Sequence, residues 1–138
     1  MESRAYGGAA FSFMNNHFWL KFVGVSGALS VMFGAFAAHG LEDTLSIQYL
    51  QTFRTAVLYQ FLHTLALFAV ICLPETLFKP RFRSWILISF AVGILLFSGS
   101  LYLLVFLNLP LLGAVTPIGG VGFILGWCLL IVAQKKVH

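Results

Sequence analysis

The sequence contains very little charge. Only 9% of its 138 residues are Asp, Glu, Lys or Arg, whereas 60% are hydrophobic. Because a soluble domain carries about 25% charged residues, this chain cannot cover a globular surface with polar side chains, and we expect most of its surface to face lipid. The length suits a single domain, and the high aliphatic and aromatic content excludes an intrinsically disordered chain.

Acidic residues are the scarcest charged type, and they lie outside the apolar runs. The four acids are Glu2, Glu42, Asp43 and Glu75. General acid–base chemistry commonly uses carboxylates in a closed site, and phosphate binding commonly uses a Gly-rich loop with a Lys, but the apolar runs contain neither. We therefore expect no enzymatic activity, no catalytic residue and no bound cofactor.

Four runs are long and apolar enough to cross a bilayer, which takes about 20 residues. They cover residues 22–38, 55–73, 85–107 and 116–133. The second run stops at Pro74, which cannot continue a helix, and the third at Asn108; the fourth begins with Thr116 as a side-chain cap and Pro117 at the first helical position. The sequence thus predicts an all-α integral membrane four-helix bundle over residues 16–138, preceded by a loose tail over residues 1–15.

A helical pattern begins well before the second apolar run. It starts at Ser46 and contains no helix-breaking residue before Pro74. A helix over residues 46–73 would be about 42 Å long at 1.5 Å per residue, which exceeds the hydrocarbon core of about 30 Å. We expect its first two turns to protrude from the membrane.

Basic residues predict the orientation, because cytoplasmic loops near the membrane retain Lys and Arg. Seven of the eight fall on one side of the four predicted spans, and Arg54 alone falls on the other. We therefore place both termini in the cytoplasm and the chain in the inner (plasma) membrane, with the mitochondrial inner membrane as the alternative. Topology accounts for the net charge of +4 better than nucleic-acid binding does, so we expect no nucleic-acid partner.

Two features of the apolar runs have alternative interpretations. The residues Ala35, Phe36 and Ala37 form a small-x-small pattern like the cleavage site of a secretory signal, so the first run is either a retained span or a removed signal. Cys72 and Cys128 lie toward the predicted cytoplasmic side, where thiols stay reduced. We expect both to be small hydrophobic fillers, with a redox pair as the alternative.

Small residues recur along the predicted spans and indicate helix packing. In lipid, helices associate through close backbone approach and interhelical hydrogen bonds. The packing positions are Ser26, Ser30, Gly34 and Ala38 in the first span, Ser89 and Gly93 in the third, and Gly119, Gly122 and Gly126 in the fourth. The spacing leaves open whether these strips lie inside one bundle or between copies.

Polar residues within the spans form the candidate site. We expect His39, Gln60, His63, Ser98 and Tyr102 to converge in the outer half of the bundle. Ionisable groups inside a membrane are costly and are functional candidates, so these residues either line a small pocket for an ion, a lipid headgroup or a quinone-like ring, or hold the helices together by hydrogen bonds. Haem or metal binding by His39 and His63 is disfavoured, because their predicted depths differ and no carboxylate lies at their level.

Several ordered motifs carry a resemblance to a known family. They are GAFAAHGL at residues 34–41, FRTA at 53–56, HTLAL at 63–67, FSGSLY at 97–102, TPIGG at 116–120 and GW at 126–127. From about residue 16 to its end the chain resembles the domain-of-unknown-function 423 family of small bacterial inner-membrane proteins and their animal relatives, called transmembrane protein 256. Ala37 departs from that family, in which Gly is frequent at this position. The resemblance implies four membrane helices and favours retention of the first span, but it implies no activity.

These observations favour a non-enzymatic membrane protein. We expect a packing partner or accessory subunit that contacts membrane lipid and either self-associates or joins a larger membrane complex. The alternative is a module that binds or transports an ion, a lipid or another small molecule through the polar residues.

Overall fold

The protein is a bundle of long antiparallel helices in the computed structural model, which describes residues 3–135 and side chains from Asn16 onward. The helices are α1 (Ser3–His39), α2 (Ile47–Cys72), α3 (Phe82–Gly93), α4 (Gly99–Leu107) and α5 (Thr116–Val132). A π-helical turn, η2 (Ile94–Ser98), joins α3 to α4, and short 3₁₀ turns, η1 (Glu75–Leu77) and η3 (Pro110–Ala114), lie between the spans. No strand occurs between residues 3 and 135, apart from one isolated bridge that pairs Phe78 with Gln134.

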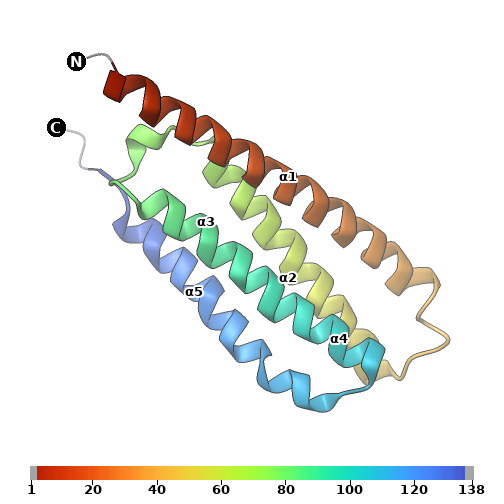
Figure 1. The fold of residues 1–138 in the computed structure, drawn as a ribbon. Coiled ribbons are helices and arrows are strands. Elements are labelled where there is room, and N and C mark those ends of the chain that lie inside the picture. Colours follow the sequence, from red (N-terminus) through yellow and green to blue (C-terminus); the bar gives the residue numbers. More distant parts are fainter. Residues whose placement is uncertain (1–2, 136–138) are drawn as a thin grey trace.

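The predicted all-α four-span architecture is confirmed. Four helical segments are long and apolar enough to cross a membrane: Asn16–His39, Ile47–Cys72, Phe82–Leu107 and Pro110–Val132. The start of α1 and the end of α5 lie at the same end of the bundle (Figure 1), as four spans require. Helix α1 begins at Ser3 and so extends through most of the segment for which the sequence predicted a loose tail, a segment that contains no proline to end a helix.

Helix α2 extends beyond the apolar run, as predicted. The Ser46 side chain caps it by accepting a hydrogen bond from the Tyr49 backbone N–H at 3.3 Å, and the helix ends at Cys72, two residues before Pro74. Its 26 residues make a helix about 39 Å long, which is longer than the hydrocarbon core of about 30 Å. This excess length corresponds to about two turns of α2.

The loop between the third and fourth spans differs in one detail from the sequence-based prediction. Asn108 ends α4 in the left-handed conformation at φ 52°, where Asn is tolerated, and its Oδ1 accepts a hydrogen bond from the Tyr49 hydroxyl at 2.7 Å. The prediction that Thr116 caps α5 through its side chain is wrong, because Val115 occupies the cap position and no side chain caps the helix. The Thr116 hydroxyl instead pairs with that of Ser100 at 2.8 Å.

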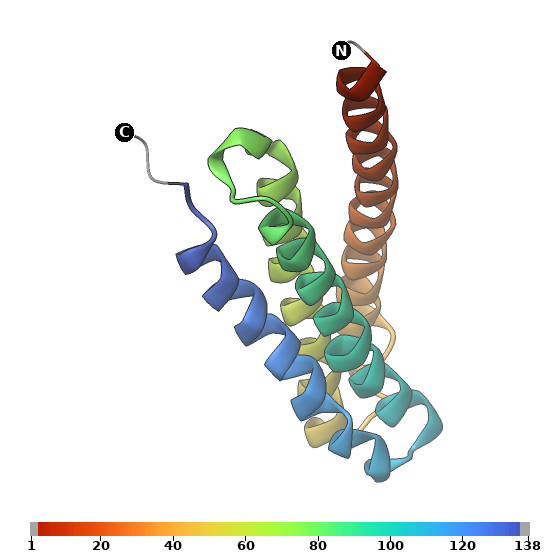
Figure 2. The ribbon, with the colours of Figure 1, turned by 60° about the vertical axis from the view of Figure 1, so that its left-hand side comes forward.

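Helix α2 and the α3–α4 span form the centre of the bundle, with α1 and α5 on opposite sides. Of the 18-residue apolar segment within each candidate span, 44% is buried in Phe82–Leu107 but only 17% in the spans of α1 and α5. Helix α1 packs mainly along α2, and α5 along α3 and η2. In the rotated view, α1 stands to one side of the other helices and diverges from them toward its N-terminal end (Figure 2).

Two apolar clusters fill the interior at different levels. One includes Trp19, Leu67 and Phe90, and the other includes Ala37, Phe53 and Leu101. The buried polar residues lie between these levels in the sequence of each helix and so form a polar layer near mid-bundle: they are Ser26, Ser30, Gln60, His63, Thr64, Ser98 and Ser100. The sequence predicted that the polar side chains converge in the outer half of the bundle. They lie near mid-bundle instead, because the apolar cluster that includes Phe53 fills the outer half.

Candidate functional site: the buried polar layer

Gln60 takes part in three hydrogen bonds of the polar layer. Its side chain is buried on α2, and its Nε2 donates to the Ser26 carbonyl at 3.0 Å and to Ser26 Oγ at 3.3 Å on α1. Its Oε1 accepts a hydrogen bond of 2.6 Å from the Tyr102 hydroxyl on α4. One amide thus joins three helices, with both its oxygen and its nitrogen bonded.

Buried hydroxyl groups form further hydrogen bonds between the helices of the polar layer. Ser26 Oγ pairs with Thr64 Oγ1 at 2.7 Å, which is a third bond between α1 and α2. Ser98, at the end of η2, donates to the Ala56 carbonyl of α2 at 2.8 Å. Because a buried polar group without a partner is costly in a medium that cannot form hydrogen bonds, these bonds explain why the hydroxyls are tolerated inside the bundle.

His63 lies one turn along α2 from Gln60, and both its ring nitrogens are bonded. Trp127 on α5 donates its indole N–H to Nε2 of His63 at 3.2 Å, while Nδ1 lies 2.8 Å from the Tyr59 carbonyl of α2. An indole can only donate, so Nε2 is the acceptor and Nδ1 carries the hydrogen. The arrangement suits a neutral imidazole with one donor and one acceptor, and it leaves no ring nitrogen free for a ligand.

Aromatic rings surround the His63 imidazole. It stacks on the Phe123 ring, with centroids 3.5 Å apart and planes 13° apart, and its centroid lies 5.7 Å from that of Phe90. Tyr59 stacks on Phe97 at 4.5 Å. The imidazole is therefore enclosed by aromatic side chains of α3 and α5.

The structure brings together four of the five residues predicted for the site, and leaves His39 apart. His39 is exposed at the C-terminal end of α1. Because Gly34 lies opposite Val57, counting 1.5 Å per residue along both helices separates His39 from His63 by about 16 Å. That distance excludes a common metal or haem iron for the pair, and among residues 3–135 no group of three His, Cys, Asp or Glu residues could hold a metal ion.

The strips of small residues lie inside the bundle. A Cβ on Gly119 would collide with the Phe97 backbone, and a Cβ on Gly122 would lie 3.2 Å from the Ser89 carbonyl oxygen. Gly126 in turn packs against the Phe90 ring, so all three glycines permit contact between α5 and the third span.

On α1, Ser26 and Ser30 are buried, and Ala37 is buried in place of Ala38. A helix has 3.6 residues per turn, so a strict four-residue repeat gradually rotates off the contact face.

Some residues that form bonds between helices were not predicted as site residues. Trp127 and Thr64 complete the bonds of the polar layer, and their partners depend on how the helices pack rather than on a local motif. Near the start of the spans, Arg83 donates to Asn16 Oδ1 at 3.1 Å, to Glu75 Oε1 at 2.8 Å and to the Ile71 carbonyl at 3.1 Å. In the sequence Arg83 indicates only orientation, whereas in the structure its side chain joins three parts of the bundle.

The two cysteines do not fill the interior. Cys72 and Cys128 are both exposed and unpaired, so the prediction that they are buried fillers is wrong. Each lies on the outward face of its helix, where a thiol contacts the surroundings of the bundle.

The architecture and the polar layer define a class of protein. The chain has four helices that can span a membrane, a lipid-compatible exterior and an interior joined by interhelical hydrogen bonds. These are the features of a small multi-pass integral membrane protein.

The comparisons identify the family. Residues 33–120 match the family described as "Protein of unknown function (DUF423)", and the chain belongs to that family. It is 42% identical over 115 residues to the UPF0382 membrane protein YwdK of Bacillus subtilis, a match that covers 81% of this chain and 91% of the relative. It is 39% identical over 124 residues to the UPF0382 inner membrane protein YgdD of Escherichia coli K12, a match that covers 90% of this chain and 94% of the relative.

A third relative, the UPF0382 membrane protein SAB0533 of Staphylococcus aureus, is 41% identical over 122 residues, with 85% of this chain and 98% of the relative covered. No solved structure matches the chain. The relatives confirm the family resemblance and the inner-membrane location, and they give no support to the mitochondrial alternative.

Proposed function

We propose that this chain is a non-enzymatic accessory subunit that acts through helix contacts with another membrane protein. The observation that carries the proposal is that the polar groups of Gln60, His63, Ser98 and Tyr102 are bonded to neighbouring helices. Their arrangement suits a structural role, because a substrate would have to break these bonds to reach the same groups.

Helix α1 supports this role as the surface for a partner. It packs mainly along α2, and large apolar side chains such as Val25 and Met32 are more than 60% exposed. A membrane helix with one main neighbour leaves room for a second helix, which can associate by close packing. The proposed partner is therefore a membrane protein that presents a complementary apolar helix to α1.

A module that binds or transports a ligand through the polar layer is less well supported. Such a site would require Tyr102 to release Gln60, or Trp127 to release His63, before a ligand could form hydrogen bonds there. The same ligand would also have to displace the Phe123 ring from the imidazole.

Purification from native membranes tests the accessory role. A tagged chain extracted in mild detergent should retain a companion, or a second copy, in a fixed stoichiometric ratio. Met32→Trp, which enlarges an exposed side chain of α1, should reduce the recovery of that companion. Leu103→Trp makes the same kind of change at an exposed side chain of α4 and should not.

Recovery of a monomer without any stoichiometric companion would contradict the proposal. Equal loss of the companion in both variants would assign the contact to a surface other than α1 and would contradict its proposed location. Retention of a small molecule that disappears in His63→Leu, with the variant still folded, would favour the binding module instead.

A further inference from the structure

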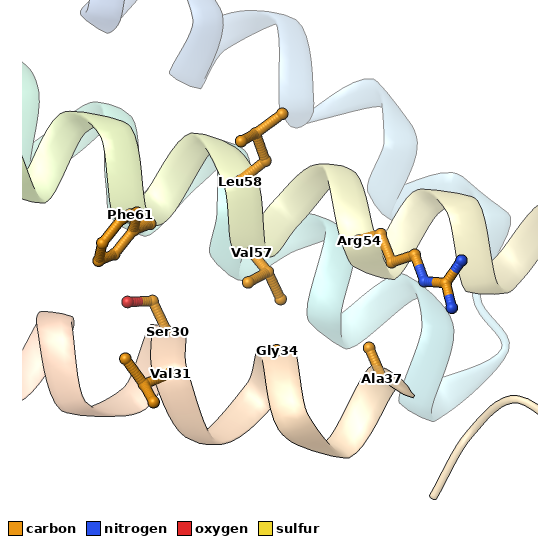
Figure 3. Close-up of a pocket in the computed structure, with 8 residues that line it drawn as sticks. All are labelled: Ser30, Val31, Gly34, Ala37, Arg54, Val57, Leu58 and Phe61. Atoms are coloured by element: carbon orange, nitrogen blue, oxygen red, sulfur yellow. The ribbon is translucent and has the colours of Figure 1, made fainter. Parts of the chain in front are cut away.

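An elongated groove runs along the outside of the bundle between α1 and α2 (Figure 3). It has a volume of about 330 Å³, which falls within the usual range for small-molecule sites. The α1 wall extends from Ser30 to Ala37 and the α2 wall from Arg54 to Phe61. Each wall covers seven residue steps, so the groove is about 10 Å long.

The two ends of the groove differ in chemistry. Arg54 lies at one end beside Ala37, and the remaining α2 wall consists of Val57, Leu58 and Phe61 (Figure 3). Ser30 is the other polar residue of the lining, but its hydroxyl donates to the Gly27 carbonyl of its own helix at 2.8 Å. The groove therefore offers a cationic group at one end and an apolar channel beyond it.

The position of Arg54 along α2 matches the edge of the membrane. It follows the first two turns of the helix, and the continuous apolar run begins at the next residue. From Arg54 the groove leads toward the middle of the bundle. A molecule bound along it would thus have its anionic part at the interface and its apolar part in the hydrocarbon region.

We propose that this groove binds one anionic phospholipid of the bilayer, with an acyl chain between α1 and α2 and the phosphate on the Arg54 guanidinium. A guanidinium matches the geometry of phosphate oxygens and can donate two parallel hydrogen bonds. The part of a linear hydrocarbon chain nearest its headgroup can lie in a channel of this length, and lipid is the medium that faces the groove.

The Arg54 side chain is available for such a contact. It is 51% exposed, and its ion pair with Glu42 is long, at 3.7 Å between Nη2 and Oε1, with Glu42 62% exposed. Exposed pairs of this kind contribute little. Glu42 competes with the phosphate for the guanidinium, so its neutralisation should strengthen lipid binding.

Lipid counting on the intact chain tests the proposal. The protein is exchanged into detergent containing equal amounts of phosphatidylglycerol and phosphatidylcholine, and retained lipid is counted by native mass spectrometry. The wild type should retain one phosphatidylglycerol per chain with about a fivefold preference over phosphatidylcholine, which corresponds to one cation at a membrane surface. Arg54→Gln should remove the preference, and Glu42→Gln should increase it.

Filling the groove should abolish retention of either lipid. Gly34→Leu places a side chain in the channel, and Val31→Trp fills it from an exposed position, so it disturbs the packing of the bundle less. Gly24→Leu is the matched control, because it is the same substitution on α1 at a position where a Cβ meets nothing within 4 Å, and it should retain lipid like the wild type.

Three results would overturn the proposal. They are absence of a retained phospholipid on the wild type, retention unchanged in both groove-filling variants, and equal loss in the Gly24→Leu control. A cross-linked dimer through Val31 that Gly34→Leu abolishes would instead assign the groove to a second copy of the chain. None of these results depends on whether α1 also contacts an accessory partner through Met32, which does not line the groove.

Discussion

The indole N–H of Trp127 donates a hydrogen bond of 3.2 Å to Nε2 of His63. This bond links α5 directly to α2. Helix α5 also bonds to the third span through the hydroxyls of Thr116 and Ser100, so the Trp127–His63 pair is a specific connection between α5 and the central helix α2.

A double-mutant cycle on this pair should reveal a coupling. We expect His63→Leu and Trp127→Phe each to lower the free energy of unfolding, because each removes the interhelical bond while retaining an apolar side chain. Their coupling energy should be about 0.6 kcal/mol, the average for such bonds in membrane proteins, as measured by unfolding in increasing sodium dodecyl sulfate. Strict additivity of the two changes would show that the bond contributes nothing.

Substitutions of Gln60 and Tyr102 should lower the stability of the protein by different amounts. Tyr102→Phe leaves Gln60 Oε1 without its donor but keeps the two bonds to Ser26, whereas Gln60→Leu removes all three bonds of the amide and leaves the buried Tyr102 hydroxyl without its acceptor. Because each unsatisfied buried group costs about 1–3 kcal/mol, Gln60→Leu should be the more destabilising change. Thermal unfolding in detergent compares the two, and a larger loss for Tyr102→Phe would contradict this description of the network.

Substitution of two adjacent glycines of α5 by alanine should have different effects on stability. A Cβ on Gly119 would lie 2.7 Å from Phe97 Cα, so Gly119→Ala should force α5 away from the third span and destabilise the protein by about 1–3 kcal/mol. The nearest atom to a Cβ on Gly120 is 3.8 Å away in the Phe97 side chain. Gly120→Ala should therefore be neutral or slightly stabilising, since Ala is the better helix former. The same thermal unfolding measurement separates them, and equal effects would argue against close packing at Gly119.

The distribution of basic residues predicts that both termini face the cytoplasm. A green fluorescent protein fused to the C-terminus should fluoresce, and alkaline phosphatase fused at the same position should be inactive. A phosphatase inserted after Asp43, in the exposed loop between α1 and α2, should be active. Reversal of these activities would overturn the orientation while leaving the four-span architecture intact.

Local signals explain how much of the fold was predictable. The start of α2 was evident from Ser46 and the uninterrupted helical pattern that follows it, and Asn108 marked the end of the third span. The polar pairing was not predictable in the same way. Gln60 and His63 are close in the sequence, but one faces α1 and α4 while the other faces α3 and α5, and only the packed bundle determines which residues they meet.

The position of the polar layer was predicted less well than its composition. Gln60, His63 and Ser98 are buried in it, and Tyr102 reaches it through its bond to Gln60. His39 lies apart, because α1 ends there and the chain turns away. Depth estimates from helix lengths also placed the layer too far outward, since they did not allow for a separate apolar cluster around Phe53.

The π-helical turn η2 has a consequence for the evolution of the chain. A π turn holds one more residue than an α-helical turn, so α3 and α4 are out of phase by about 100° compared with a continuous α-helix. Deletion of a single residue from this turn would rotate Tyr102 away from Gln60 and present a tyrosine hydroxyl to hydrocarbon. Changes in chain length should therefore be far less acceptable within Ile94–Ser98 than in the loops that connect the spans.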